Sequence, residues 1–542
     1  MTSFEHLSNE IFYEIFEYLD ICQAYEIFAY FNHRFRYLFV ESSLLYHIKL
    51  DLLSHQSFQQ YCQHLISPNK HRIISLRLAN PFTIDRYFTF FPLDHASFLN
   101  LRSLTLNDIE SDKLASLLTL LATFPRFVSL SCTVEPSVRN LETIHQSLFA
   151  LPVLKYCNMT IKQQYPVEFV LPNPAKDCQP SSIEYFISQT RYTPLQLSNL
   201  LLRMSRITHL SCRVLLPYWV TSSIPSIHLP HLKHLSIHCH ISFIQSEILL
   251  YAIVAHQLEV LHIRAISVSD YLKADRWEQL ITIRFPCLRL FDLQYCGSFY
   301  TDDEYQPLID GFKSRFWMER NWSFAHRCYP YKQSTWLLFS SINDSTENNV
   351  DLEEIVVFDS GARIDVQSTH MTVSTQNRMK STCVFSIDQL AKIIPCERLT
   401  RLTVLNDFPI EDIIGLVNIS QHIRSLVLQG YSSKLLSLAN RNNIQQMILR
   451  GNLTFQDVQS LMEAFRYLKC LKLTVAENDL ELILRFLIQH IKKQAEHCVL
   501  HLVGFLDAHS LLVRRLRKVI DFEGYANSFT IESISDTAYL WW

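Results

Sequence analysis

The stretch LRSLTLN, at residues 101–107, shows the pattern on which this chain is organised. Apolar residues fill its first, fourth and sixth positions, and polar residues fill the third and fifth. Because successive side chains of a β-strand point to opposite faces, this frame predicts a strand whose apolar side chains face a core. The two polar positions between them then face outward.

The same frame recurs at intervals of about 24 to 30 residues, a spacing typical of leucine-rich repeats. Nine copies begin at Ile73, Leu101, Phe127, Leu154, Ile183, Ile207, Leu232, Leu258 and Leu288. Helical patterns such as Asp112–Leu121 and Leu141–Phe149 lie between them, so we expect each repeat to form a strand, a loop and a helix. A second run of copies begins at Leu352, Leu399, Ile423, Ile444 and Leu468. Stacked repeats bury their apolar faces in one shared core.

Residues 294–351 separate the two runs. There, Asn321–Cys328 and Thr335–Ser340 alternate in polarity around a turn with Pro330, which predicts a β-hairpin. We therefore expect an α/β protein with a helical domain at residues 1–48, repeats at 49–310, an insert at 311–350, further repeats at 351–480 and a C-terminal cap at 481–542. The cap should contain a helix at Leu480–Lys493 and a strand at Val499–Val503.

Residues 1–48 follow a helical pattern. Apolar residues four positions apart predict a first helix with one apolar stripe, formed by Leu7, Ile11, Ile15 and Leu19. Phe12 and Phe16 lie beside this stripe, and two shorter helices are expected at Ala24–Tyr30 and Asn32–Val40. A unit of about 40 residues is too small to be stable alone, so it must pack on a neighbouring surface.

The order of residues in this unit resembles the F-box: LSNEI at residues 7–11, then Ile15, Tyr18-Leu19, Phe28 and FNHRF at residues 31–35. The resemblance implies a three-helix domain that docks on the Skp-type adaptor of a cullin-RING ubiquitin ligase. It implies adaptor contacts at Leu7, Ser8, Ile11, Ile15, Leu19, Phe31 and Phe35. A plainer alternative is an amphipathic helical cap that closes one end of the repeat array.

An F-box followed by irregular leucine-rich repeats is similar to the substrate receptors of SCF-type E3 ubiquitin ligases. The function that this resemblance implies is to bind a protein substrate on the repeats while the ligase core supplies the chemistry. The alternative is a leucine-rich-repeat scaffold or inhibitor with no ubiquitin role.

Composition limits the class of partner. The chain has 49 Lys and Arg residues against 52 Asp and Glu residues, so no net field draws it to nucleic acid or to a membrane. The opening residues MTSFEHLSNE lack the features of a secretory signal. We expect a cytoplasmic protein with free thiols, and the basic run at Arg514–Lys518 leaves a nuclear location open.

The outward positions of the predicted strands are small and polar, with scattered histidines. We predict that His209, His234, His262 and Asp292 lie close together on neighbouring strands and mark the surface that binds a protein substrate. The ordinary alternative is that they are solvated side chains of a sheet, because few residues of an interface carry its binding energy.

Catalytic and metal signatures are absent from the sequence. His234, His238 and His240 share one face of a strand, yet no cysteine pair accompanies them, and we predict no metal site and no cofactor. The chain has no Gly-rich phosphate loop, no His-Glu-x-x-His and no Gly-x-Ser-x-Gly motif, so we predict no enzyme activity. A hydrolase that uses His and Cys on the sheet is a third alternative.

Overall fold

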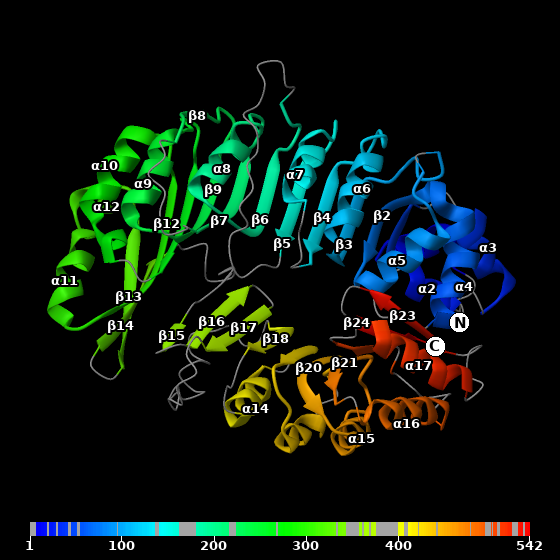
Figure 1. Cartoon of the computed structure of the whole chain (residues 1–542). Coiled ribbons are helices and arrows are strands. Elements are labelled where there is room, and N and C mark those ends of the chain that lie inside the picture. Colours follow the sequence, from blue (N-terminus) through cyan, green and yellow to red (C-terminus); the bar gives the residue numbers. More distant parts are fainter. Residues whose placement is uncertain are drawn as a thin grey trace. The chain divides into compact units, whose positions relative to one another are not determined.

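The computed structural model of the chain contains two compact units (Figure 1). The first comprises residues 1–51 and 61–347, and the second comprises residues 52–60 and 348–542. The structure describes residues 7–18, 21–28, 31–41, 45–50, 55–94, 96–135, 140–161, 180–215, 224–266, 269–331, 334–342, 357–359, 362–367, 370–375, 399–405, 410–420, 422–440, 443–476, 478–493, 500, 502–506, 510–522, 529–534 and 537–541. Both units are α/β.

The first unit is built on a 12-stranded sheet with the order β1-β2-β3-β4-β5-β6-β7-β9-β11-β12-β14-β13. Its strands are β1 (Tyr46–Leu50), β2 (Ile73–Leu78), β3 (Ser103–Ile109), β4 (Ser129–Val134), β5 (Tyr156–Ile161), β6 (Tyr185–Tyr192), β7 (His209–Leu215), β9 (His234–His240), β11 (Val260–Ile266), β12 (Leu290–Phe299), β13 (Ser323–Tyr331) and β14 (Ser334–Ile342). Each of the nine predicted frames forms one strand, and all neighbours from β1 to β12 are parallel.

Helices connect these parallel strands and cover one face of the sheet (Figure 1). They are α5 (Pro81–Phe90), α6 (Ser111–Leu121), α7 (Leu141–Phe149), α8 (Pro194–Leu201), α9 (Phe243–Ala252) and α10 (Ala274–Arg284). The predictions for α6 and α7 are confirmed. The apolar frame residues are buried, as Leu104 and Leu235 show with exposed fractions of 0%.

The chain enters successive strands through the same backbone hydrogen bonds. Before β12, the N–H groups of Arg289 and Leu290 both donate to the Glu259 carbonyl, over 2.8 and 3.0 Å. An equivalent pair precedes every strand from β4 to β11 in this sheet. Because each repeat anchors its turn on the preceding repeat, outward side chains at the same frame position pair directly across the strands.

The three predicted N-terminal helices are confirmed as α1 (Asn9–Tyr18), α2 (Ile21–Phe28) and α3 (His33–Glu41). The hydroxyl of Tyr46 in β1 donates to the Phe39 carbonyl of α3, and Arg72 Nη1 donates to the same carbonyl over 3.1 Å. The first strand therefore supplies the surface that such a small helical unit needs. The boundary predicted at residue 48 is wrong, because β1 crosses it and the helices pack with the sheet in one unit.

The predicted hairpin is confirmed as β13 and β14, which pair antiparallel. β14 also pairs antiparallel with β12, so the hairpin extends the sheet as its last two strands. The helices α11 (Asp302–Gly311) and α12 (Arg315–Glu319) precede it. Trp317 of α12 is fully buried and its ring lies 5.4 Å from that of Phe324, which packs this end of the sheet with aromatic side chains.

The second unit is built on a ten-stranded sheet with the order β15-β16-β17-β18-β19-β20-β21-β22-β24-β23. Its strands are β15 (Val357–Asp359), β16 (Ala362–Gln367), β17 (His370–Thr375), β18 (Arg401–Leu405), β19 (Ser425–Leu428), β20 (Gln446–Leu453), β21 (Cys470–Val475), β22 (Leu502–Phe505), β23 (Thr530–Ile534) and β24 (Thr537–Trp541). The pairs from β17 to β22 are parallel. Its helices include α14 (Ile410–Ile419), α15 (Phe455–Ala464), α16 (Leu480–Lys493) and α17 (Ser510–Phe522).

Two predictions for this unit need correction. Val357 does not end a repeat frame but begins β15, which pairs antiparallel with β16, and the other apolar residues of that frame, Leu352 and Ile355, lie outside the described residues. The strand predicted at Val499–Val503 is β22, which pairs parallel with β21, so the parallel array continues past residue 480. The predicted helix Leu480–Lys493 is confirmed as α16. In the part of the chain that the structure describes, the helices are too short or too polar to cross a membrane.

Candidate interaction surfaces

The start of α1 is fixed to α3 by one side chain. Arg34 Nη2 donates to the Leu7 carbonyl and to Asn9 Oδ1, both over 2.6 Å, and Arg34 Nε donates to the same Asn9 oxygen over 3.0 Å. The guanidinium also lies 5.4 Å from the centre of the Phe12 ring. Arg34 therefore orients the first helix, which sets which side chains of α1 face outward.

The apolar residues of α1 divide into two faces. Phe12 and Phe16 are buried, and Phe12 meets Phe35 edge-on with ring centres 4.7 Å apart. Ile11 of the same helix is 41% exposed, and Phe31, just before α3, is 61% exposed. Large apolar side chains that the unit's own core does not use are candidates for contact with a partner.

The residues implied as adaptor contacts differ in how far they are exposed. Ile11 and Phe31 are exposed, Leu7 and Ile15 are half-buried, and Ser8 is exposed just before α1. Phe35 is fully buried, because its ring fills the space between the three helices; it is a core residue and not a surface contact.

Leu19 lies outside the described residues. We call Ile11, Ile15 and Phe31 the N-terminal apolar patch.

A row of four rings crosses the outward face of the first unit's sheet. The register places Tyr156, Tyr185, His209 and His234 directly beside one another on β5, β6, β7 and β9. The ring centres of Tyr185 and His209 lie 4.2 Å apart, and those of His209 and His234 lie 4.1 Å apart with planes at 10°. This ring row brings together two of the four predicted substrate-binding residues.

Both histidines of the ring row favour the neutral state. Burial, the neighbouring His234 and Lys233 lower the pKa of His209. Burial also lowers the pKa of His234, although Glu259 opposes this shift. Two imidazoles stacked face to face would repel each other if both were protonated, so the stack is stable above the pKa values of the pair.

The other two predicted residues meet in the next row. His262 and Asp292 are direct neighbours on β11 and β12, with His262 Nδ1 3.0 Å from Asp292 Oδ2. Ser341 donates to the other carboxylate oxygen, and Gln294 Nε2 lies 3.3 Å from Oδ2. Burial alone would raise the pKa of Asp292, but the hydrogen bonds from His262 and Ser341 lower it. The predicted placement on neighbouring strands is confirmed for His209 with His234 and for His262 with Asp292, while the role of these residues stays a prediction.

Sequence reasoning missed a row of basic residues beside these. Arg191, Arg213, His238 and Arg264 are direct neighbours on β6, β7, β9 and β11. We call them the arginine row. Arg213, His238 and Arg264 occupy the seventh position of their repeats, one outward step beyond the six-residue frame. The signal was present in the sequence, because strand alternation places the seventh position on the same face as the third and fifth.

Contacts within the arginine row determine the protonation state of His238. Arg264 Nη1 lies 3.3 Å from His238 Nε2, and Arg213 Nη2 donates to Gln189 Oε1 over 3.2 Å. Burial lowers the pKa of His238 well below its usual value, and the charges of Arg264 and Arg213 lower it further. His238 is therefore neutral, and its Nε2 accepts a hydrogen bond from Arg264.

Metal binding finds no support at these histidines. His238 Nε2 is engaged by Arg264, and His234 is stacked on His209. Among the residues that the structure describes, no group of three or more His, Cys, Asp and Glu side chains could hold a metal ion.

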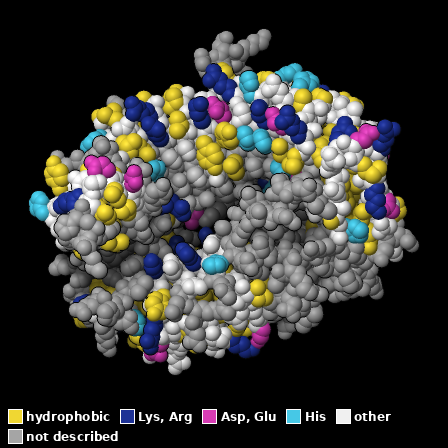
Figure 2. All heavy atoms as spheres, turned by 180° about the vertical axis from the view of Figure 1, so that it is seen from behind, with side chains coloured by type: hydrophobic (Ala, Val, Ile, Leu, Met, Phe, Trp, Pro, Cys, Tyr) yellow, Lys and Arg dark blue, Asp and Glu magenta, His cyan; other side chains and the backbone are white. Residues whose placement is uncertain are grey.

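The described surface is also mixed in charge. Figure 2 shows Lys and Arg side chains interspersed with acidic and apolar ones on the face in view.

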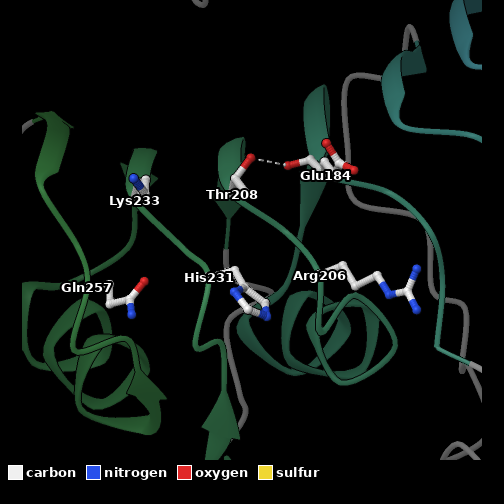
Figure 3. A pocket seen from close by; sticks show the side chains of 6 residues that line it. All are labelled: Glu184, Arg206, Thr208, His231, Lys233 and Gln257. Carbon is white, nitrogen blue, oxygen red and sulfur yellow. Dashed lines mark hydrogen bonds between the residues drawn. The ribbon is translucent and has the colours of Figure 1, made fainter.

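A shallow depression of about 320 Å³ lies where the strands begin, lined by Glu184, Arg206, Thr208, His231, Lys233 and Gln257 (Figure 3). The Thr208 hydroxyl donates to the Glu184 carbonyl over 2.9 Å. Lys233 Nζ lies 3.4 Å from Glu259, and Glu184 pairs with Lys155 over 2.9 Å. The polar groups of Thr208, Lys233 and Glu184 are thus used to join neighbouring repeats, and the Thr208 hydroxyl also lies 2.9 Å from His209 Nδ1.

Comparison with protein-family models and with curated proteins finds no match for this chain.

Proposed function

We propose that this chain is the substrate-recognition subunit of an SCF-type E3 ubiquitin ligase. Helices α1 to α3 act as an F-box that docks on the Skp-type adaptor, and the strand–helix units act as leucine-rich repeats that bind a protein substrate on the outward face of the sheet. The ubiquitin chemistry belongs to the cullin-RING ligase core. The observation that carries the proposal is the N-terminal apolar patch.

The patch has the energetic character of a protein interface. Phe12, Phe16 and Phe35 are buried in the interior of the helices, whereas Ile11 is 41% exposed and Phe31 is 61% exposed, although the Phe31 ring meets that of Phe35 edge-on. Complete burial of one such side chain is worth about 1.5 to 3 kcal/mol. A few residues of this size at the centre of an interface supply most of its binding energy.

A second candidate function is a leucine-rich-repeat scaffold whose helices only close the array. The contacts of Tyr46 and Arg72 with the Phe39 carbonyl favour it, because they tie the helices to the sheet as a cap would be tied. Under this alternative the helices have no partner of their own. The two functions therefore differ in what happens when the exposed patch is changed.

The experiment is binding of the full chain to a purified Skp-type adaptor, measured by isothermal titration calorimetry. We expect a one-to-one complex that Ile11→Arg weakens at least tenfold, because a charge would be buried against an apolar surface. Ile283→Arg on α10 is the matched control, since Ile283 is 63% exposed and lies on a different helix. It should bind like the unmodified chain.

Absence of adaptor binding by the unmodified chain at micromolar concentration would overturn the proposal. Equal binding by the Ile11→Arg chain would show that the patch is not the docking surface. Far-UV circular dichroism checks that both variants keep their helices and strands.

A further inference from the structure

The ring row continues across the sheet as a strip of uncharged side chains. Beyond His234, the direct register neighbours are Val260 on β11 and Leu290 on β12. We call the ring row together with these two residues the uncharged strip: Tyr156, Tyr185, His209, His234, Val260 and Leu290. It crosses six neighbouring strands, about 24 Å at the usual strand spacing. All of its side chains are at least partly exposed, and that of Tyr185 is 38% exposed.

Both imidazoles of the strip are neutral at pH 7, because burial lowers the pKa of His209 and of His234. The Thr208 hydroxyl also fixes one tautomer. It donates its single proton to the Glu184 carbonyl over 2.9 Å, so it accepts a hydrogen bond from His209 Nδ1, which lies 2.9 Å away. His209 Nε2 therefore carries a lone pair and acts as an acceptor.

Charged residues border the strip one position earlier in the chain, where opposite charges pair with each other. Lys155 lies 2.9 Å from Glu184, and Lys233 lies 3.4 Å from Glu259. Arg289, just before β12, lies 3.9 Å from the other carboxylate oxygen of Glu259. The border therefore offers no continuous charge of one sign, and the strip itself adds none.

Stacking orders the rings of the strip before any partner binds. The ring planes of Tyr185 and His209 lie at 15°, and those of His209 and His234 lie at 10°. A side chain that is already ordered loses less conformational entropy on binding. Tyrosine is also enriched among the residues that carry the energy of protein interfaces, and a contiguous apolar surface is more typical of a binding site than scattered apolar side chains. The strip thus has the character of the centre of an interface.

The chemistry of the strip indicates an uncharged partner. A carboxylate or ammonium group placed against it would lose hydration without gaining an opposite charge, which is costly. Aromatic and aliphatic side chains lose no such hydration, and a backbone N–H or a hydroxyl group of the partner can donate to His209 Nε2. An extended chain advances about 3.3 Å per residue, so about seven residues cover the strip.

We propose that the uncharged strip binds an extended, uncharged segment of the substrate protein through the aromatic and aliphatic side chains of that segment. This inference rests on the proposed function only in taking the outward sheet face as the substrate surface, and it does not depend on adaptor docking. Alternate side chains of the segment pack against the rings, and its backbone supplies the hydrogen bond to His209 Nε2.

Acid should weaken this binding. The titratable groups that face the two imidazoles from the neighbouring repeats are Tyr185, Lys233, Glu259 and His262. Glu259 favours a protonated His234, but burial outweighs it. A partner that covers the rings disfavours their protonated forms further. The affinity is therefore full at pH 7 and decreases as the pH falls through the pKa values of the free chain.

The test is selection of random dodecapeptides displayed on phage against the full chain at pH 7, followed by fluorescence anisotropy of the selected peptides. We expect Phe, Tyr, Trp, Leu and Ile to be enriched in them and Asp, Glu, Lys and Arg to be depleted. Tyr185→Ser should weaken binding at least tenfold, whereas Tyr185→Phe keeps the ring and should weaken it less. Tyr467→Ser is the matched control, because Tyr467 is 51% exposed and lies in the second unit. It should change the affinity by less than twofold.

Val260→Ser provides a second variant within the strip, and the unfolding midpoint of each variant checks its fold. Recovery of no peptides, or of mainly acidic or basic ones, would overturn the inference. Equal affinity at pH 7 and pH 5, or equal weakening by Tyr467→Ser, would also contradict it. Peptides that lose affinity for the Ile11→Arg chain but not for the Tyr185→Ser chain bind the N-terminal apolar patch and count against the inference. The adaptor titration is independent of these peptides, which separates failure of this inference from failure of the adaptor proposal.

Discussion

The two units make the same pair of backbone hydrogen bonds at the start of their strands, but they present different outward faces. In the first, the N–H groups of Lys233 and His234 donate to the Thr208 carbonyl; in the second, those of Gln445 and Gln446 donate to the Arg424 carbonyl. The outward residues of β7, β9 and β11 include histidines and arginines. In the second unit, the third and fifth frame positions on β19 to β21 are Ser425, Gln446, Cys470, Val427, Ile448 and Lys472, and the seventh positions are Gln429, Arg450 and Thr474, so it has no histidine at these positions and one arginine. The repeat fixes the architecture, and the outward positions remain free to acquire chemistry.

The interiors differ as well. The second unit has an apolar core, and its buried polar residues among those described are hydroxyl-bearing: Thr403, Ser420, Ser425 and Thr537. The first unit buries titratable side chains, including His145 and His238. Acid should therefore act on the two units differently, while loss of an apolar frame residue should act on them alike.

The largest expected effect is the loss of stability when a buried leucine of the frame is replaced, and it should be similar in the two units. Leu235 and Leu471 occupy the fourth position of their frames in the two units, and both are fully buried. Replacing either by Ala should cost about 2 to 5 kcal/mol of unfolding free energy, because a cavity replaces packed side-chain atoms. Differential scanning calorimetry of each variant measures the loss. The outward change Ser236→Ala is the control and should stay within about 0.5 kcal/mol; a cost for Leu471→Ala near that of the control would contradict the shared frame.

A smaller effect is the dependence of stability on pH, which should differ between the two units. His145 of α7 is buried, with Nδ1 2.8 Å from the Leu141 carbonyl and Nε2 3.3 Å from the Tyr192 hydroxyl. Burial lowers the pKa of His145 to about 4, although the bond to Leu141 opposes the shift. The folded chain therefore binds its proton less readily than the unfolded chain, so stability is full above pH 6.5 and falls as pH decreases toward 4.

At pH 5 this single group should cost about 2 kcal/mol of unfolding free energy. Urea titrations from pH 7 to pH 5 measure the slope, and His145→Gln should reduce it without abolishing it, because the pKa of His238 is also lowered. If unfolding free energy depends on pH in His145→Gln as it does in the unmodified chain, the pH dependence does not come from His145. The calorimetric transition of the second unit should lack this dependence, since its described buried polar groups do not titrate in that range.

Much of the fold could be predicted because apolar residues recur at fixed intervals in its strands and helices. The frame beginning at Leu232 determines β9, and the pattern of Leu480–Lys493 determines α16 to the residue. β1 was missed although LYHIKL at residues 45–50 fits the frame, because the helical domain was predicted to extend to residue 48; Ile48 and Leu50 are in register with Leu76 and Leu78 of β2. Phe35 was misassigned because helical spacing gives the apolar residues of α3 but not which of them the neighbouring helices cover.

The candidate surface could be predicted only in part. Outward positions follow from strand alternation, so His209 and His234 could be placed on neighbouring strands from their frames alone. Their stacking, and the opposition of Arg191 to Arg213, depend on register. A local irregularity between Ser188 and Arg191 shifts that register, and no periodicity in the sequence reports such a shift.

The smallest expected effect asks whether the two units also share their helix starts. Thr193 begins α8 and Thr454 begins α15, and each accepts a hydrogen bond from the backbone N–H three residues later, over 3.2 and 3.4 Å. In each case the residue at that third position bonds back to the threonine N–H: Gln196 over 2.9 Å and Asp457 over 3.0 Å. Replacing either threonine by Ala should cost about 1 kcal/mol, since it leaves one N–H of the first turn without its side-chain acceptor.

The chemistry of the third residue then decides any difference between the two threonine variants. Asp457 keeps a negative charge beside the first turn of α15 after Thr454→Ala, and this charge still stabilises the helix dipole. Gln196 offers no charge, so Thr193→Ala should be the costlier change at neutral pH. Unfolding free energies of the two variants at low and high salt measure this, because salt screens the contribution of Asp457 and should bring the two losses together. If Thr454→Ala loses more stability than Thr193→Ala at low salt, the charge of Asp457 beside the helix dipole does not determine the difference between them.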